Sequence, residues 1–246
     1  MISSSKNDKV KYVARLQAER RFRWREQAFV VEGTRWLSEL TISDAPLQIV
    51  FYTEDWFRSP DHVVILQQLR APVQIVRPEV MAAMSDTDTP AGVLAVVGMA
   101  AKTWPLLPSL LLVLDGISNP GNLGTMLRAA AAAGVDGVLL GPGCVDVYNP
   151  KALRGGMGAH LRLPIQALDW PEIRPLLAGL TVWLADVGEG VDYTPFLAHA
   201  LGAYYRQRGV GDAGRSGQSG LRPLHHPHAR RHRIAQRRPG RRHYPL

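Results

Sequence analysis

The most constraining feature of the sequence is a short apolar run that leads into a loop rich in glycine and asparagine. Residues 110–114 are all leucine or valine, which is typical of a strand buried on both faces of a parallel sheet. After the loop, an alanine-rich stretch at 123–133 favours a helix and stops at Gly134. A second apolar run covers residues 138–140. This order predicts a strand, a loop, a helix and another strand, as in an α/β domain.

A smaller α/β domain is predicted before it, over residues 1–100. Strand-like runs occupy 48–53, 73–76 and 92–98, and helical patterns lie near 33–40, 61–70 and 78–84. Residues 101–109 contain Pro105 and Pro108 without a clear period, so they are interpreted as a linker. Two domains fit a chain of 246 residues with 46% hydrophobic residues.

Residues 6–26 combine basic and aromatic side chains in a helix-compatible pattern. Positive charge beside aromatic rings suits a phosphate backbone and stackable bases, so Lys11, Arg15 and Arg23 are candidates for RNA binding. On composition alone, a solvated helix face is the alternative.

The loop at 115–124 and the helix behind it contain two candidate site residues, Asn122 and Arg128. Ligands of parallel α/β sheets usually bind beyond the carboxyl ends of the strands, where this loop lies. An asparagine at a helix start also serves as a cap, which is the alternative role of Asn122. Arg128 stands alone in an apolar, alanine-rich helix, and burying a guanidinium without a partner is expensive.

A second loop follows the second apolar run and contains Gly141 and Gly143, with Lys151 and Arg154 further on. Glycines allow a backbone to approach a ligand closely, and the two basic side chains suit the phosphates of RNA. The pattern matches neither a Walker loop nor the dinucleotide fingerprint.

Together, the two loops resemble the SpoU/TrmH family of RNA ribose methyltransferases. The stretches similar to the family's first two motifs are Asp115-Gly116-x-x-Asn119-Pro120-Gly121-Asn122-Leu123-Gly124-Thr125-x-x-Arg128 and Asn149-Pro150-Lys151-x-x-Arg154-x-x-x-Gly158-Ala159. Asn7-x-x-Val10-Lys11 and Phe29-Val30-Val31-Glu32-Gly33 are similar to the substrate-binding domain of many members. The resemblance spans about residues 3–194. One departure is Gly155, where many relatives carry a small hydroxyl residue.

The resemblance implies a SPOUT α/β-knot domain, with a trefoil knot, that usually forms a homodimer. It implies methyl transfer from S-adenosylmethionine to a ribose 2′-hydroxyl of rRNA or tRNA. Arg128 corresponds to the family's arginine at the acceptor hydroxyl, assisted by Asn122. Because an arginine is normally protonated, positioning and electrostatic stabilisation are preferred over proton abstraction. Leu140, Gly141 and Gly143 are the candidates for the wall of the cofactor pocket, with a simple tight turn as the alternative.

Residues 195–246 differ from the rest of the chain in charge and pattern. They hold eleven arginines, no lysine and one acidic residue, whereas the other 194 residues carry 18 basic and 20 acidic side chains. This tail shows almost no helix or strand periodicity and lacks the family's third motif, a Gly-Asn-Glu-Gly-like loop with a later Ile-Pro-Met stretch. Three interpretations compete: a disordered RNA-binding tail, a histidine-rich metal tract, and a wrong reading frame.

The genetic code favours the wrong reading frame. Suitably chosen codons for residues 203–211, read from the second base, give Leu-Ile-Ile-Gly-Ser-Glu-Ala-Trp-Gly. Codons for residues 226–237 give Ile-Pro-Met-Pro-Gly-Gly-Thr-Glu-Ser-Leu-Asn-Ala at the same offset. Both halves of the missing motif thus return in order. We therefore expect a frame slip near residues 194–195, a truncated methyltransferase domain at 110–194, and an out-of-frame, disordered basic tail at 195–246.

Composition and the N-terminal sequence narrow the possible locations and cofactors of the protein. The N-terminus lacks an apolar signal region and no stretch reaches about 18 apolar residues, so neither secretion nor a membrane span is expected. A single cysteine, Cys144, allows no disulfide framework or zinc cluster, so a cytoplasmic protein without a metal is expected. The alternative function is a non-catalytic RNA-binding module in which residues 1–100 grip RNA.

Overall fold

The structure is a computed structural model that describes residues 1–185, 191–192, 201–206 and 222–225. The chain divides into two compact units that interleave along the sequence. The first contains Met1–Trp104, Ile117–Val135 and Gly143–Ile165, and the second contains Pro105–Gly116, Asp136–Pro142 and the described part of Gln166–Leu246. Of the candidate loop residues, Asn122, Arg128 and Gly143 therefore fall in the first unit, whereas Leu140 and Gly141 fall in the second unit with the strands.

The first unit is built on a four-stranded sheet with the order β1-β4-β2-β3. Its strands are β1 (Ala28–Glu32), β2 (Leu47–Tyr52), β3 (Val73–Ile75) and β4 (Val93–Gly98). The central β4 runs antiparallel to both β1 and β2, and β2 runs parallel to β3. Every residue of β4 is buried, as expected for a strand covered on both faces. The strands predicted at 48–53, 73–76 and 92–98 are confirmed.

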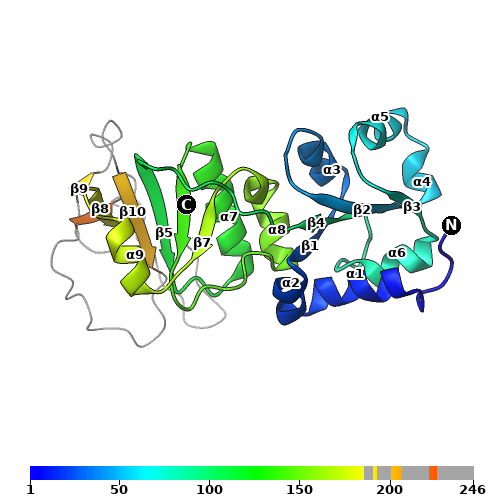
Figure 1. Cartoon of the computed structure of the whole chain (residues 1–246), viewed down its shortest axis with the longest axis horizontal. Coiled ribbons are helices and arrows are strands. Elements are labelled where there is room, and N and C mark those ends of the chain that lie inside the picture. Colours follow the sequence, from blue (N-terminus) through cyan, green and yellow to red (C-terminus); the bar gives the residue numbers. More distant parts are fainter. Residues whose placement is uncertain (186–190, 193–200, 207–221, 226–246) are drawn as a thin grey trace. The chain divides into compact units, whose positions relative to one another are not determined.

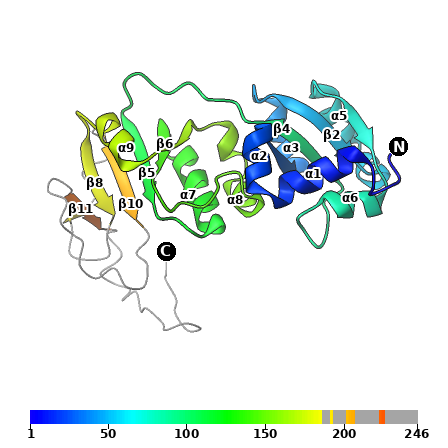
Figure 2. The same cartoon turned by 60° about the horizontal axis from the view of Figure 1, so that its bottom comes forward.

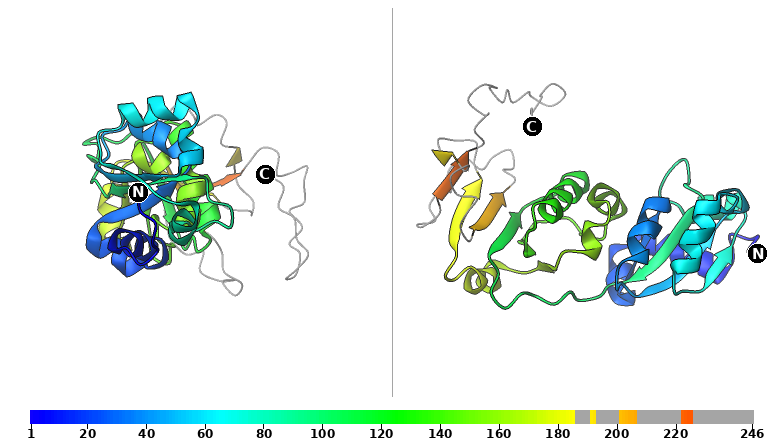
Figure 3. Two further views of the ribbon diagram at one scale, coloured as in Figure 1. Left: turned by 90° about the vertical axis from the view of Figure 1, so that its right-hand side faces the viewer. Right: turned by 90° about the horizontal axis from the view of Figure 1, so that it is seen from above.

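Helices cover both faces of this sheet (Figures 1 and 3). They are α1 (Asp8–Ala18), α2 (Arg20–Glu26), α3 (Thr34–Thr41), α4 (Glu54–Phe57), α5 (Pro60–Gln68) and α6 (Pro78–Met84). Successive residues of β1 point to opposite faces: Phe29 packs with Trp36 of α3, whereas Val30 packs with α1 and α6. The two hydrophobic cores thus follow from the period-two pattern of the strand.

Three more helical segments belong to the first unit, namely α7 (Pro120–Ala132), α8 (Pro150–Gly156) and the 3-10 turn η1 (Ala159–Leu161). Leu153 of α8 and Leu161 of η1 complete the core on the α3 face of the sheet. The α7 and α8 helices carry the residues of the first and second motifs. Helix α8 is therefore attached to the N-terminal sheet through one hydrophobic core, and α7 packs on α8.

A buried ion pair joins α2 to the loop before α8. Arg23 is 3% exposed, and its Nη2 lies 2.8 Å from Asp146 Oδ2. Arg23 Nη1 also donates to the carbonyl oxygens of Leu16 and Gln17, at 2.6 and 2.9 Å, near the end of α1. A helix C-terminus favours a cation, so both groups around Arg23 suit its charge. The geometry corrects the prediction that Arg23 contacts RNA, because its guanidinium is enclosed by protein.

The second unit is a seven-stranded sheet with the order β7-β6-β5-β10-β8-β11-β9 (Figure 2). Its elements are β5 (Leu110–Asp115), β6 (Gly137–Leu140), β7 (Ile165–Ala167), α9 (Trp170–Leu176), β8 (Thr181–Ala185), β9 (Val191–Asp192), β10 (Leu201–Arg206) and β11 (Arg222–His225). The pairs β5–β6, β5–β10 and β8–β10 are parallel. The predicted strands at 110–114 and 138–140 are confirmed, so the chain order strand, loop, helix, strand is correct.

The strand β10 departs from the expectation of a tail without regular structure. It pairs with β5 along its whole length, from Leu201 beside Leu110 to Arg206 beside Asp115, and with β8 on its other side. Five of its six residues, Leu201–Tyr205, are paired on both sides, and they form a strand that sequence periodicity does not reveal. The tail contains a second strand, β11, which pairs with β8 and β9. The other tail residues, the reading-frame hypothesis and the knot's completion lie outside the described residues. Within the described residues, no helix has the length and apolar character to cross a membrane.

The buried ion pair gives a first prediction. Asp146→Ala should lower the free energy of unfolding by about 3–5 kcal/mol, because Arg23 would remain buried without its charge partner. Lys11→Ala is the control, since Lys11 and Asp8 form an exposed pair that should matter little. Urea denaturation measures both variants. A loss for Asp146→Ala no larger than that for Lys11→Ala would show that the pair does not hold the unit together.

Candidate functional site

The start of α7 is fixed by Asn119 rather than by Asn122. Asn119 Oδ1 accepts hydrogen bonds from the backbone amides of Gly121 and Asn122, at 2.8 and 3.2 Å. Pro120 occupies the first helical position, where its missing amide hydrogen is not needed. Asn122 is exposed, and its side chain is not used as the helix cap. The structural alternative for Asn122 is therefore wrong, and its amide is available to a ligand.

Arg128 lies two turns into α7 with its side chain exposed. Its Nη1 lies 3.1 Å from the sulfur of Met157, just beyond the end of α8. In the described part of the chain, no carboxylate lies within ion-pair distance of Arg128. It follows Asn122 by six positions, which places the two side chains about 120° apart around the helix, with Thr125 between them. The three residues form a polar edge on a helix that is otherwise apolar or small.

The α7 and α8 helices approach each other through glycine. A Cβ atom on Gly124 would stand 2.4 Å from the carbonyl oxygen of Ala152 and 2.8 Å from the amide nitrogen of Gly156. A Cβ on Gly155 would stand 3.3 Å from the Gly121 oxygen, so a small hydroxyl residue there requires a slight adjustment. The glycine at 155 is thus a packing feature of this chain. The close approach brings Met157 within reach of Arg128.

Helix α8 carries two basic side chains, and only one of them is paired with a carboxylate. Asn149 caps the helix by accepting from the amide of Lys151 at 2.9 Å, and the Lys151 side chain is exposed. Arg154 Nη1 lies 2.9 Å from Asp86 Oδ2, with both side chains a little over one-third exposed. Asp86 belongs to a loop organised by Glu32, whose carboxylate accepts from the hydroxyl of Ser85 at 2.7 Å. Lys151 is open to an anion, whereas Arg154 already has a carboxylate partner.

His160 is the buried titratable group beneath this helix pair. Its Nε2 lies 2.9 Å from the Val147 carbonyl oxygen, and its Nδ1 has no hydrogen-bond partner. Burial lowers the pKa of His160 to about 4, so the ring is neutral near pH 7 and donates from Nε2. A Cβ on Gly156 would stand 2.5 Å from the ring, so the imidazole packs directly on that glycine.

The predicted RNA-binding residues of α1 are both exposed and both paired. Lys11 Nζ lies 3.4 Å from Asp8 Oδ1. Arg15 donates to both carboxylate oxygens of Glu19 at 3.1 Å and lies over the ring of Phe22, 4.0 Å from its centroid. Such surface pairs are weak, so both cations remain accessible to a phosphate.

The predicted cofactor residues lie where parallel strands end. Because β5, β6, β8 and β10 are parallel, their carboxyl ends share one edge of the sheet. Leu140 is 2% exposed, and its carbonyl oxygen accepts from the Leu168 amide at 3.0 Å. Gly141 is also buried: its amide donates to the Leu114 oxygen at 2.7 Å, and a Cβ on it would stand 2.9 Å from Asp115 Oδ1.

Gly143 differs from the other two predicted cofactor residues because it is exposed and has a φ of 79°. Left-handed backbone of this kind favours glycine and turns the chain sharply. Gly143 belongs to the first unit, whereas Leu140 and Gly141 belong to the second. The tight-turn role is thus seen at Gly143, whereas Leu140 is the last residue of β6 and Gly141 follows it without a positive φ.

Two residues of this region were missed by the sequence reasoning, Asp146 and Met157. Asp146 is a lone carboxylate between two valines, and an acid in such an apolar context is a signal for a buried partner. Met157 has a φ of 46° at the end of α8, a backbone conformation that sequence does not reveal. Among the residues that the structure describes, no group of three His, Cys, Asp or Glu side chains is placed to hold a metal ion.

Two family models match the chain. Residues 7–95 match the MRM3-like substrate binding domain, and residues 109–198 match the SpoU rRNA Methylase family. The two matches cover the first and second domains predicted from the sequence, with residues 96–108 between them.

Curated proteins similar to this chain are rRNA methyltransferases. The mitochondrial rRNA methyltransferase 3 of Xenopus tropicalis is 36% identical over 205 residues, which is 77% of this chain and 46% of that protein. The 23S rRNA (guanosine(2553)-2'-O)-methyltransferase RlmP of Bacillus subtilis is 31% identical over 69% of this chain and 66% of its own length. The chain thus spans about half the length of the mitochondrial relatives that it matches.

Solved structures agree on the fold. The SpoU methyltransferase AviRb from Streptomyces viridochromogenes, in complex with AdoMet, has a TM-score of 0.75 at 22% identity, over 89% of this chain and 88% of that one. A structure described as an RNA 2'-O ribose methyltransferase has a TM-score of 0.72 at 26% identity, over 91% and 88%. The predicted α/β fold with a SpoU-type methyltransferase domain is therefore confirmed, whereas the truncation of that domain stays a prediction.

The neutral state of His160 predicts a pH dependence of stability. Its pKa is about 4 in the folded chain and about 6.5 when unfolded, so the unfolded chain binds an additional proton between these values. The free energy of unfolding should therefore fall by about 3 kcal/mol as the pH drops from 6.5 through 4. Urea denaturation at several pH values measures this loss, and His160→Gln should remove most of it. An equal pH dependence in both chains would show that His160 is not buried in its neutral form.

Proposed function

Because the chain belongs to the SpoU rRNA methylase family, we propose that it transfers a methyl group from S-adenosylmethionine to a ribose 2′-hydroxyl of RNA. The relatives named as rRNA methyltransferases support rRNA as the substrate class. The AdoMet complex of AviRb supports the cofactor. When bound, S-adenosylmethionine supplies a methyl group already activated by its sulfonium.

The observation that carries this function is the state of Arg128. An exposed guanidinium that touches a thioether, with no described carboxylate partner, can donate its remaining hydrogen bonds to a ligand oxygen. Met157 restrains Arg128 from one side and leaves the other open.

The reaction needs alignment and proton loss at a poor nucleophile. A ribose hydroxyl reacts only when its oxygen points at the methyl carbon, so fixed hydrogen bonds to it lower the barrier. We assign this positioning to Arg128 and assistance to the Asn122 amide. Arginine stays protonated near neutral pH, so Arg128 stabilises negative charge that develops on the oxygen and does not take the proton, which would pass to water.

The cofactor is assigned to the carboxyl edge of the parallel sheet, with Leu140, Gly141 and Gly143 forming one wall. The fit is supported by two left-handed glycines beyond strand ends, Gly116 at a φ of 66° and Gly143 at 79°, which allow close approach of a ligand to the backbone. The Leu140 carbonyl and the Gly141 amide already form hydrogen bonds within the protein. Their role is therefore to hold the edge of the sheet in place rather than to bind the cofactor directly. Gly143 is the exposed member of the three.

RNA contact is assigned to Lys11, Arg15, Lys151 and Arg154. Arg154 would exchange Asp86 for a phosphate, which is feasible because the pair is partly exposed. We also propose a homodimer, because the family that the chain resembles usually forms one. A cytoplasmic location is part of the proposal because a chain with one cysteine suits a reducing compartment.

The reading-frame hypothesis bears directly on activity. The family match ends at residue 198, close to the predicted slip at residues 194–195. The residues that would supply the third motif are absent from the written sequence and return in the shifted frame. We therefore propose that restoring the frame after Thr194 completes the cofactor site.

The test is methyl transfer to transcribed rRNA, which carries no methyl groups. Labelled S-adenosylmethionine is supplied to the full chain as written and to the frame-restored chain, and alkali-resistant linkages report 2′-O-methylation. Arg128→Ala should lower kcat roughly 100- to 1,000-fold, the range for losing one donor to a developing oxyanion. RNA affinity should change little.

Arg174→Ala serves as the matched control, because Arg174 is an exposed arginine on α9 outside the candidate site. It should leave kcat unchanged. Absence of methyl transfer by both full-length chains would contradict the methyltransferase function. RNA binding without methyl transfer would favour the non-catalytic binding module.

A further inference from the structure

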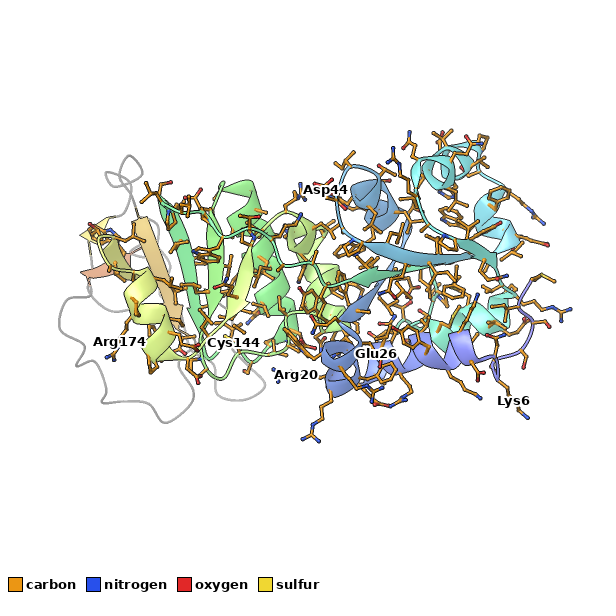
Figure 4. The ribbon with its side chains drawn as sticks, viewed as in Figure 1. Lys6, Arg20, Glu26, Asp44, Cys144 and Arg174 are labelled. Carbon is orange, nitrogen blue, oxygen red and sulfur yellow. The ribbon has the colours of Figure 1, made fainter. Side chains whose placement is uncertain are left out.

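Helix α2 carries four arginines in seven residues, and the structure separates them by environment. Arg23 is enclosed by Asp146 and the end of α1, and Arg25 Nη2 lies 2.8 Å from Glu26 Oε1. Arg20 and Arg21 are exposed, and within the described part of the chain neither has a carboxylate at ion-pair distance (Figure 4 labels Arg20 and Glu26). Two cations of α2 are therefore open to an anionic partner.

Trp24 shares the face of α2 that carries these two cations. It follows Arg20 by four residues and Arg21 by three, the spacings at which side chains are neighbours on a helix. Its side chain is 38% exposed, whereas the other aromatic ring of α2, Phe22, is 5% exposed. Phe22 is also covered by Arg15 and Arg25, whose guanidinium carbons lie 4.0 and 4.7 Å from its centroid. The helix thus offers one open ring beside two open cations.

The open ring is held in a fixed orientation. Trp24 Nε1 donates to Asp146 Oδ1 at 3.1 Å, the carboxylate that also binds Arg23. The ring of Tyr148 meets that of Trp24 edge to face, with 5.7 Å between centroids. A partly exposed tryptophan held from two sides loses little side-chain entropy when a partner stacks on it. This arrangement is that of a binding platform rather than of a core residue.

We propose that Trp24 is a base-stacking residue of an RNA-docking face formed with Arg20 and Arg21, and that Asp146 positions its ring. The choice of RNA as the partner rests on the function proposed above. An unstacked base fits a flat aromatic surface, and flanking guanidinium groups reach the adjacent phosphates. The same carboxylate of Asp146 accepts from the amide of Tyr148 in the loop before α8, so the platform is tied to the second motif.

The first test measures the affinity of the full chain for a labelled, short single-stranded RNA by fluorescence anisotropy. Trp24→Ala should weaken binding roughly 5- to 150-fold, the range for losing one base stack. Trp24→Phe keeps a ring but loses the bond to Asp146, so its affinity should lie between those of Trp24→Ala and the unaltered chain. Phe57→Ala is the matched control, because Phe57 is also 38% exposed but lies on α4. Phe57→Ala should bind the RNA with unchanged affinity.

The second test separates stacking from charge. The double variant Arg20→Gln/Arg21→Gln should reduce the slope of log affinity against log salt by about 1.4, since each lost phosphate contact on a single strand removes about 0.7. Trp24→Ala should leave this slope unchanged. The double variant Arg70→Gln/Arg77→Gln removes the same charge from two exposed positions outside α2 and should leave both affinity and slope unchanged.

A third measurement needs no variant and so does not depend on folding. Ultraviolet cross-linking of the unaltered chain to the same RNA, followed by mass spectrometry, should place a nucleotide on the peptide that contains Trp24. Unchanged affinity in Trp24→Ala, or cross-links only elsewhere, would overturn the inference. A chain that methylates RNA but binds it independently of Trp24 contradicts this inference alone. A chain that binds RNA through Trp24 yet transfers no methyl group contradicts only the methyltransferase function.

Discussion

The buried ion pair between Arg23 and Asp146 is the interaction on which the first unit depends. Two charges taken out of water are tolerated only when they are paired and their remaining hydrogen bonds are satisfied. Here the guanidinium also binds the last carbonyls of α1, and the carboxylate also binds Trp24 and the amide of Tyr148. One pair therefore fixes α1, α2 and the loop that leads into α8. It links the basic surface of the N-terminal domain to the second family motif.

The glycine contact between α7 and α8 is the second constraint, and it positions the reactive end of the site. Without a side chain on Gly124, the two backbones come close enough for Met157 to meet Arg128. His160 packs against the same helix pair from the inside and remains neutral near pH 7 because burial depresses its pKa. The exposed polar edge of α7 thus rests on a tightly packed base, as a positioning role for Arg128 requires.

Sequence reasoning was reliable where local pattern decides structure and unreliable where tertiary contacts decide it. The apolar run at 110–114 and the alanine-rich helix are encoded by period and propensity, so both were predicted. Arg15 and Arg23 belong to one basic stretch, and only the fold shows that Arg15 is on the surface while Arg23 is buried. The cap of α7 was placed at Asn122 as an alternative, but two asparagines lie three residues apart and only geometry selects Asn119. The strand β10 was missed because its bonds come from distant neighbours.

The most direct measurement is isothermal titration of S-adenosylmethionine into two full-length chains. One is the chain as written, and the other has the reading frame restored after Thr194. The candidate cofactor wall at Leu140, Gly141 and Gly143 is present in both, whereas the third motif is present only in the restored chain. Binding by the restored chain alone is the predicted result. Equal binding by both would contradict the assigned role of the third motif, and binding by neither would contradict the methyltransferase function.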